Sequence, residues 1–190
     1  MEIPNRQPDI LHRMDSVSDE ALFDRFRRSL DETAFAGLSD RLTASALSYA
    51  RSLLGCRHAA EDAVQEAFLR VIRCRDRYDP SRSFRGWFFA ILRNACLDEH
   101  RRRRREKNSM VRLGEAVECS SEGEDPGEVL RALDRLPDEL REPLVLRLWG
   151  HLEFCEISRI CGCSLDAVKK RIQRALARLR ERIASSEYLS

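Results

Sequence analysis

Arginine and lysine side chains offer the clearest chemistry in this sequence, which is the binding of phosphate groups. Residues 84–105 carry seven Arg against two acids, and residues 164–183 carry seven Lys or Arg against two acids, so each segment has a net charge of +5. Between them, residues 114–128 hold six acids and no base, a net charge of −6. The overall charge of +2 hides this segregation. Positive charge concentrated in two separate segments is typical of a protein that binds a polyanion such as nucleic acid.

Residues of the metal-ligand type gather beside the second basic segment: His151, Cys155, Cys161 and Cys163. A helix-turn-helix normally fills the positions of Cys161 and Cys163 with buried apolar residues, so we favour packing over zinc binding. The carboxylates of residues 60–70 have no His, nucleophile or ligand set at a useful spacing. The sequence therefore predicts no metal, no cofactor and no catalytic residue, and it gives no sign of a small-molecule substrate.

The second basic segment has the pattern of a helix-turn-helix. A short helix stops at Gly162, the residue type that most readily takes a left-handed backbone, and Ser164 can cap the next helix. Apolar residues recur on one stripe of that helix: Leu165, Val168, Ile172, Leu176, Leu179 and Ile183. The candidate DNA-contacting residues fall largely off the stripe: Lys169, Lys170, Arg171, Gln173, Arg174 and Arg178. Such side chains can contact phosphates and base edges in a major groove, whereas the plainer alternative is a solvated surface helix.

The first basic segment differs in kind, because it combines cations with aromatic rings. Trp87, Phe88 and Phe89 stand beside Arg85, and five consecutive Arg follow at 101–105. Rings stack on unpaired bases while guanidinium groups hold phosphates, so this combination suits single-stranded nucleic acid. The alternative is that aromatic residues at helical spacing belong to the core. We expect Trp87 and Phe88 to be partly buried in either case.

These segments need helices to position them, and the composition favours helices. Apolar residues make up 43% of the chain and charged residues 35%, with only 8 Gly and 6 Pro. Helical periodicity begins after a candidate cap at Ser18, a helix ends at Gly55, and Ser83 can cap the aromatic helix. Pro143 is expected to kink a later helix or delay its start.

The predicted fold is all-α, with two small helical domains joined by a flexible acidic linker, and the C-terminal domain is a helix-turn-helix. The expected divisions are a lead at 1–17, a helical domain at 18–106, the linker at 107–127, the helix-turn-helix domain at 128–185 and a tail at 186–190. No apolar stretch is long enough to span a bilayer, and the first residues lack the apolar region of a secretion signal. We therefore expect a cytoplasmic protein with reduced cysteines.

Three segments in order resemble the bacterial sigma family, specifically its short two-domain branch, the extracytoplasmic-function (ECF) sigma factors. Residues 61–70 (EDAVQEAFLR) are similar to the helix that docks on the clamp of RNA polymerase. Residues 84–94 (FRGWFFAILRN), which run into Asp98 and the Arg run, are similar to the helix that reads and melts the −10 element. Residues 133–147 and 156–182 resemble the domain that reads the −35 element.

The resemblance implies a transcription initiation factor that directs core RNA polymerase to promoter DNA and helps to open it. The residues that it assigns to core-polymerase binding are Asp62, Gln65, Glu66, Phe68 and Leu69. Those assigned to the −10 element are Phe84, Arg85, Trp87, Phe88, Asn94, Asp98, Arg101 and Arg102, with the 79–84 loop. Those assigned to the −35 element are Lys169, Lys170, Arg171, Gln173 and Arg174. An anti-sigma factor is a further expected partner, because the family often uses one.

Two other classes of protein compete with this interpretation. A conventional helix-turn-helix regulator, which binds duplex DNA without core polymerase, would account for residues 128–184 but would leave the two N-terminal motifs without a role. A nucleic-acid enzyme would need paired acids or a metal cluster near a groove, and the sequence offers neither. For residues 60–70 alone, a charged outer face on a core helix explains the composition as well as a docking surface does.

Overall fold

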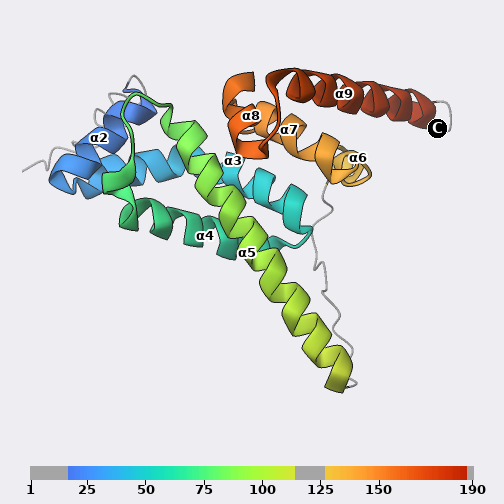
Figure 1. Ribbon diagram of the computed structural model, residues 1–190, viewed down its shortest axis with the longest axis horizontal. Coiled ribbons are helices and arrows are strands. Elements are labelled where there is room, and N and C mark those ends of the chain that lie inside the picture. The colour runs from blue at the N-terminus through green and yellow to red at the C-terminus, as the bar shows by residue number, and fades with distance from the viewer. Residues whose placement is uncertain (1–16, 114–126, 188–190) are drawn as a thin grey trace, which may run out of the picture.

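The computed structural model describes residues 17–113 and 127–187, with side chains placed for 17–106 and 131–181, and all regular structure in these ranges is helical (Figure 1). The predicted all-α fold is therefore confirmed. Nearly all of the predicted lead, the acidic centre of the linker and the last residues of the tail lie outside the described residues. Within the described residues, no helix is long and apolar enough to cross a membrane.

The N-terminal module contains these helices: α2 (Asp19–Ser29), α3 (Glu32–Leu54), α4 (Arg57–Arg73), the short 3-10 helix η1 (Arg75–Arg77) and α5 (Phe84–Leu113). Their ends follow the expected chemistry. Ser18 Oγ accepts a hydrogen bond from the Ala21 N–H at 3.2 Å, which satisfies one of the unpaired donors at the start of α2. Gly55 ends α3 in the left-handed conformation at φ 64°.

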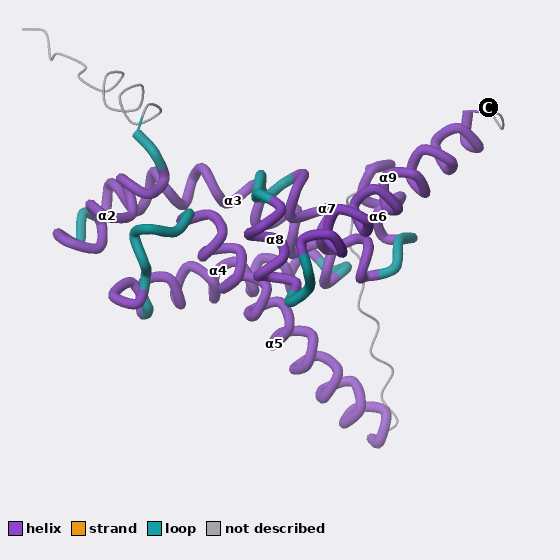
Figure 2. Tube along the Cα trace, turned by 45° about the horizontal axis from the view of Figure 1, so that its top comes forward, coloured by secondary structure: helices purple, strands orange, loops and turns teal. Residues whose placement is uncertain are grey.

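Helix α5 is longer than the sequence predicts. Its 30 residues continue to Leu113, so the first part of the predicted linker at 107–127 is helical. In Figures 1 and 2 the second half of α5 projects away from the other helices like an arm. The first half packs against α3 and α4, so the same helix joins a buried aromatic segment to an exposed basic one.

The C-terminal module contains α6 (Gly127–Asp134), α7 (Asp138–Leu148), α8 (Phe154–Cys161) and α9 (Leu165–Glu187). Pro143 lies inside α7 and is buried. The helix already begins at Asp138, so Pro143 does not delay its start. Leu165, the first residue of the predicted apolar stripe, is 41% exposed, and Leu148 is 44% exposed. Both stand at a helix end.

The two modules touch. Helix α3 packs against α7 and α5 packs against α8, and the buried residues of both modules form one continuous cluster. The cluster contains Phe23, Tyr49 and Phe88 from the N-terminal module and Leu144 and Val168 from the C-terminal one. The two predicted helical modules therefore do not stand apart, because their buried residues form a shared core.

Candidate nucleic-acid interface

The turn between α8 and α9 has the local geometry that the sequence predicts. Gly162 ends α8 in the left-handed conformation at φ 63°. Ser158 Oγ donates a hydrogen bond to the Cys163 carbonyl at 2.5 Å, and Ser164 Oγ accepts one from the Ala167 N–H at 3.2 Å. These bonds fix the direction in which α9 leaves the turn, as a recognition helix requires.

Helix α9 separates its apolar and basic residues by face. Val168, Ile172 and Ala175 are buried against the module core. The opposite face is exposed and holds Lys169, Lys170, Gln173 and Arg174, with Arg171 half-buried beside them. Among the described residues, none of these four cations has a carboxylate within 4.0 Å. The predicted duplex-reading residues therefore share one accessible surface of unpaired positive charge.

The aromatic residues of the first half of α5 are less accessible than their predicted role requires. Phe84 is 1% exposed and Phe88 is 0% exposed, so these two rings lie in the core and support the site from inside. Trp87 is half-buried and lines a cavity of about 150 Å³. The C-terminal module supplies the opposite wall of this cavity with Glu156, Arg159 and Ile160. In this arrangement Trp87 faces α8.

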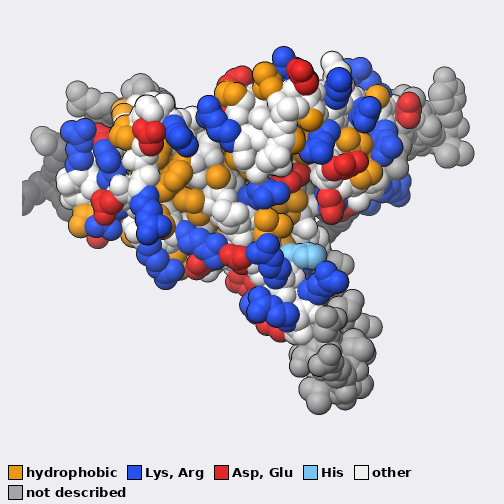
Figure 3. All heavy atoms as spheres, in the orientation of Figure 1, with side chains coloured by type: hydrophobic (Ala, Val, Ile, Leu, Met, Phe, Trp, Pro, Cys, Tyr) orange, Lys and Arg blue, Asp and Glu red, His pale blue; other side chains and the backbone are white. Residues whose placement is uncertain are grey.

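Of the polar residues of α5 that the resemblance assigns to the −10 element, Arg85 is half-buried and pairs with Asp19 at 2.7 Å, whereas the others are exposed. Most of these exposed residues already have partners. Asp98 pairs with Arg70 at 2.9 Å and with Arg101 at 3.2 Å. Arg102 pairs with Glu99 and with Glu106, each at 2.8 Å. Figure 3 shows Lys and Arg side chains interleaved with acids along this part of α5. Asn94 is exposed and has no side-chain partner among the residues that the structure describes.

The predicted docking residues occupy one helix, α4, but they are not equivalent. Asp62, Gln65 and Leu69 are exposed on the same face, and Leu69 is 47% exposed although it is apolar. Glu66 accepts a hydrogen bond from Arg70 Nε at 2.8 Å. Phe68 instead turns inward, with its ring 5.1 Å from that of Phe88. Three of the five residues thus form an open surface, while Phe68 packs against α5 and Glu66 pairs within α4.

A partly buried ion pair joins the modules. Arg93 of α5 contacts Glu142 of α7 at 2.5 Å, and the Tyr49 hydroxyl donates to the same carboxylate at 3.2 Å. Burial, with a contribution from Glu142, raises the pKa of Tyr49 well above its usual value. The same two causes raise the pKa values of the Cys96 and Cys161 thiols to about 12. These thiols are therefore protonated and unreactive at neutral pH.

The residues considered as zinc ligands do not form a site in the part of the chain that the structure describes. Cys155 is exposed, whereas Cys161 and Cys163 are half-buried. No three His, Cys, Asp or Glu side chains among the described residues are placed to hold a metal ion.

Sequence reasoning missed the residues that support the interface from a distance: Asp19, Glu20, Arg70, Arg93 and Glu142. Each one reads as an ordinary charged residue on a helix surface. Their partners lie 28 to 66 residues away along the chain, and no local pattern marks such a pair.

Comparison with known proteins agrees with this geometry. Sigma-70 region 2 matches residues 39–106, and Sigma-70 region 4 matches residues 127–179. The ECF RNA polymerase sigma factor EcfG of Rhodopseudomonas palustris is 32% identical over 140 residues, which cover 70% of this chain and 75% of that protein. The ECF RNA polymerase sigma factor SigW of Bacillus subtilis is 28% identical over 169 residues, which cover 80% and 90%.

Two solved structures are similar along most of the chain. One is CnrH in complex with the cytosolic domain of CnrY, with a TM-score of 0.66 and 28% identity over 88% of this chain and 97% of that one. The other is the sigma factor RpoE of Bartonella quintana in complex with the anti-sigma factor NepR, with a TM-score of 0.63 and 29% identity over 76% and 92%. Both family segments, the sequence relatives and the shared fold lead to one conclusion: the chain belongs to the sigma-70 family, as an RNA polymerase sigma factor of the ECF type.

Proposed function

We propose that the two modules divide promoter recognition between duplex and opened DNA. The observation that carries this proposal is the exposed face of α9, where Gln173 stands among four cations that have no ion pair in the described residues. Such a face gives affinity through phosphates and selectivity through base edges. We assign to it the −35 element, read as duplex through Lys169, Lys170, Arg171, Gln173 and Arg174.

We assign the −10 element to α5 and to the loop at 79–84 that precedes it. Asn94, Asp98, Arg101 and Arg102 are exposed along α5, where they can contact an opened strand. Unstacking a base costs a few kcal/mol per step, so contacts to the opened strand must offset that cost. Phe84 and Phe88 contribute by packing beneath the loop, and Arg85 and Trp87 border it.

We assign the docking of core RNA polymerase to the exposed face of α4. Leu69 is an exposed apolar residue on a helix whose other outward residues are polar, which suits a small protein interface. Asp62 and Gln65 lie on the same face and supply its polar rim. Phe68 packs on Phe88 of α5, and Glu66 pairs with Arg70, which in turn pairs with Asp98 of α5.

On this proposal the chain performs no phosphodiester chemistry itself and acts in the cytoplasm, where it lends core polymerase its choice of promoter. The solved complex of RpoE with the anti-sigma factor NepR supports a partner of that kind for this chain as well.

A selection experiment tests the proposal and does not require the promoter sequence to be chosen in advance. The purified chain and core polymerase are incubated with a library of randomised duplexes, and the templates that give run-off transcripts are recovered and sequenced. We expect two conserved elements, near −35 and −10, and no enrichment when either protein is omitted. Equal enrichment by the chain without polymerase would identify a conventional helix-turn-helix regulator instead.

The docking surface is tested with two matched pairs of substitutions. Asp62→Lys with Leu69→Lys should lower affinity for core polymerase at least about a hundredfold, because interface positions of this kind dominate binding energy. Glu32→Lys with Ala36→Lys makes the same kinds of change at exposed positions of α3 and should leave that affinity within about twofold. An unchanged complex with the α4 variant, measured by sizing chromatography, would place the docking site elsewhere.

A further inference from the structure

The family segment that matches sigma-70 region 2 begins at residue 39, so α2 lies outside it. Even so, α2 contacts both ends of the loop at 79–84. Building on the proposed −10 role of that loop, we infer that Asp19 and Glu20 are positioning residues, which hold the loop in the geometry that receives an opened promoter strand.

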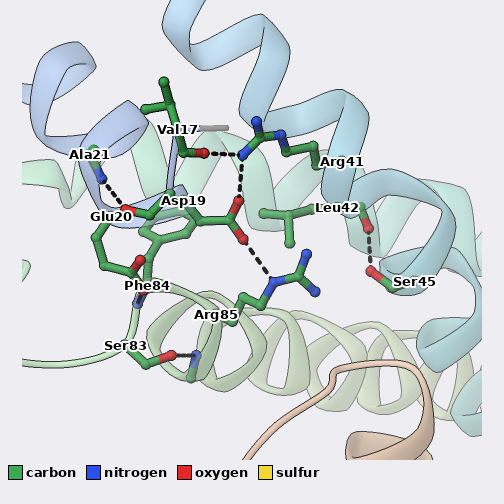
Figure 4. Close-up of polar contacts among 12 residues, drawn as sticks. Val17, Asp19, Glu20, Ala21, Arg41, Leu42, Ser45, Ser83, Phe84 and Arg85 are labelled. Carbon is green, nitrogen blue, oxygen red and sulfur yellow. Dashed lines mark hydrogen bonds and ion pairs between the residues drawn. The ribbon is translucent and has the colours of Figure 1, made fainter. Parts of the chain in front are cut away.

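Glu20 caps a helix that begins 64 residues further along the chain. Its Oε1 accepts a hydrogen bond from the backbone N–H of Phe84 at 3.1 Å (Figure 4). Phe84 is the first residue of α5, and the first N–H groups of a helix have no partner within it. Ser83 Oγ accepts from another N–H of this first turn, that of Gly86, at 3.1 Å. A carboxylate from α2 therefore completes the cap where the loop enters α5.

Asp19 holds the side chain of Arg85, the residue that follows Phe84. Its Oδ2 accepts from Arg85 Nε at 2.7 Å and its Oδ1 from Arg41 Nη1 at 3.1 Å, as Figure 4 shows. The Asp19 side chain is only 11% exposed, so water screens these ion pairs weakly. Arg41 also donates to the Val17 carbonyl at 2.7 Å, which anchors the start of α2 on α3.

An aromatic contact holds the other end of the loop. The Phe23 ring of α2 lies 5.2 Å from Tyr78 and 4.5 Å from Phe84, the residues on either side of the loop's exposed part. The Tyr78 hydroxyl donates to the Arg82 carbonyl at 2.6 Å, which closes the loop on itself. Asp79 accepts hydrogen bonds from the Ser81 hydroxyl at 2.7 Å and the Ser81 N–H at 3.0 Å, and these bonds lower the pKa of its carboxyl group.

The loop is therefore exposed at its middle and fixed at both ends. A loop that is already ordered loses little entropy when a base enters it, whereas a loosened loop must be ordered each time. Removing the α2 contacts should consequently slow strand opening and weaken selection among bases. Polymerase docking on α4 and duplex binding by α9 should not change.

The test uses the full chain with core polymerase on the selected promoter, with 2-aminopurine placed in its −10 element. We expect Glu20→Ala and Asp19→Ala each to slow the fluorescence rise of opening about tenfold, which corresponds to about 1.4 kcal/mol. The preference for the selected base at the flipped −10 position should fall by a similar factor. Glu20→Gln retains the acceptor oxygen and should restore both values to within about threefold of the wild type.

Asp24→Asn is the matched control, because it removes a carboxylate of the same helix that pairs with Arg27 and Arg28 of α2 itself. It should open the promoter like the wild type. Unchanged opening and base preference in both alanine variants would overturn the inference. So would a loss of polymerase binding in these variants, or a Glu20→Gln variant as slow as Glu20→Ala, because α2 would then serve docking or general stability. Failure of the wild-type chain to open any promoter would count against the proposed function instead.

Discussion

The basic segments of α5 and α9, residues 84–105 and 164–183, carry the same net charge by sequence, yet they present it differently. On α5, Arg101 and Arg102 are paired with acids of their own helix. On α9, the four cations of the exposed face have no ion pair within the described residues. A phosphate can therefore approach these α9 cations directly, whereas at Arg101 and Arg102 of α5 it must first displace a carboxylate. On the proposed division of roles, α9 supplies the initial affinity for duplex DNA, and Arg101 and Arg102 of α5 exchange their carboxylate partners for phosphates once a strand is available.

The largest expected effect removes charge from α9. Replacing Lys169, Lys170, Arg171 and Arg174 by Ala should weaken binding of the holoenzyme to the selected duplex about a hundredfold at low salt. The dependence of log K on log salt should become shallower by about 3 to 4, because each lost phosphate contact removes about 0.9. Fluorescence anisotropy across a salt series measures both quantities.

The double substitution Arg101→Ala with Arg102→Ala tests the difference between the paired cations of α5 and the unpaired cations of α9. Its binding to a single-stranded −10 oligonucleotide is measured by fluorescence anisotropy across a salt series. We expect a loss of about threefold to tenfold for this pair, since each guanidinium gives up an existing ion pair to bind. If each charge on α5 proved worth as much as each charge on α9, the distinction between paired and unpaired cations would be wrong.

A smaller and opposite effect is expected from freeing the arginines of α5. Glu99→Gln with Glu106→Gln removes both carboxylate partners of Arg102. Affinity for the single-stranded oligonucleotide should rise about twofold to threefold at low salt and return to the wild-type value at high salt, where exposed charges are screened. Glu139→Gln, at an exposed position of α7, is the control for lost negative charge. A decrease in affinity would mean that these carboxylates orient the guanidinium instead of competing for it.

The smallest expected effect concerns the pH dependence of the stability of the N-terminal module. Burial raises the pKa of Tyr78 to about 12, from an ordinary value of 10.0. Because the folded value is the higher one, the stabilisation from Tyr78 is complete below pH 10 and is lost as the pH rises towards 12. The stability advantage of the wild type over Tyr78→Phe should therefore shrink across that interval. Cys96 and Cys161 act in the same direction in both proteins, so the difference between the proteins isolates the tyrosine.

Urea unfolding monitored by Trp87 fluorescence, in a Trp149→Phe background, measures this difference at each pH. The Trp87 and Tyr78 rings are 5.2 Å apart, so the signal reports on the N-terminal module. A constant difference from about pH 8 to about pH 12 would contradict the prediction.

Local patterns predicted most of the helices and their ends. Ser18, Gly55, Ser83, Gly162 and Ser164 all act where their side-chain or backbone chemistry places them. Such residues act within a few positions of themselves, so a single sequence is enough to identify them. The fold class and the helix-turn-helix followed from these signals together with apolar periodicity.

The exposure of the aromatic residues and the supporting contacts could not be predicted in this way. Helical spacing cannot tell a ring that faces a base from one that faces a neighbouring helix, and Phe84 and Phe88 lie on the side of α5 that faces its neighbours. The Glu20–Phe84 and Arg70–Asp98 contacts join helices that approach each other only in the folded chain. They depend on tertiary packing, which propensity does not encode.

The Arg93–Glu142 contact has a practical consequence for dissecting the protein. A fragment that ends before α6 would leave Arg93 and the Tyr49 hydroxyl without their shared carboxylate. A fragment that begins at α6 would carry Glu142 into water together with the apolar surface that now covers α3. Affinities measured on isolated halves would then include the free-energy cost of exposing the contact surface between the two modules. Quantitative work on either half should therefore start from the intact chain, with the unwanted DNA-binding face disabled by substitution and not by truncation.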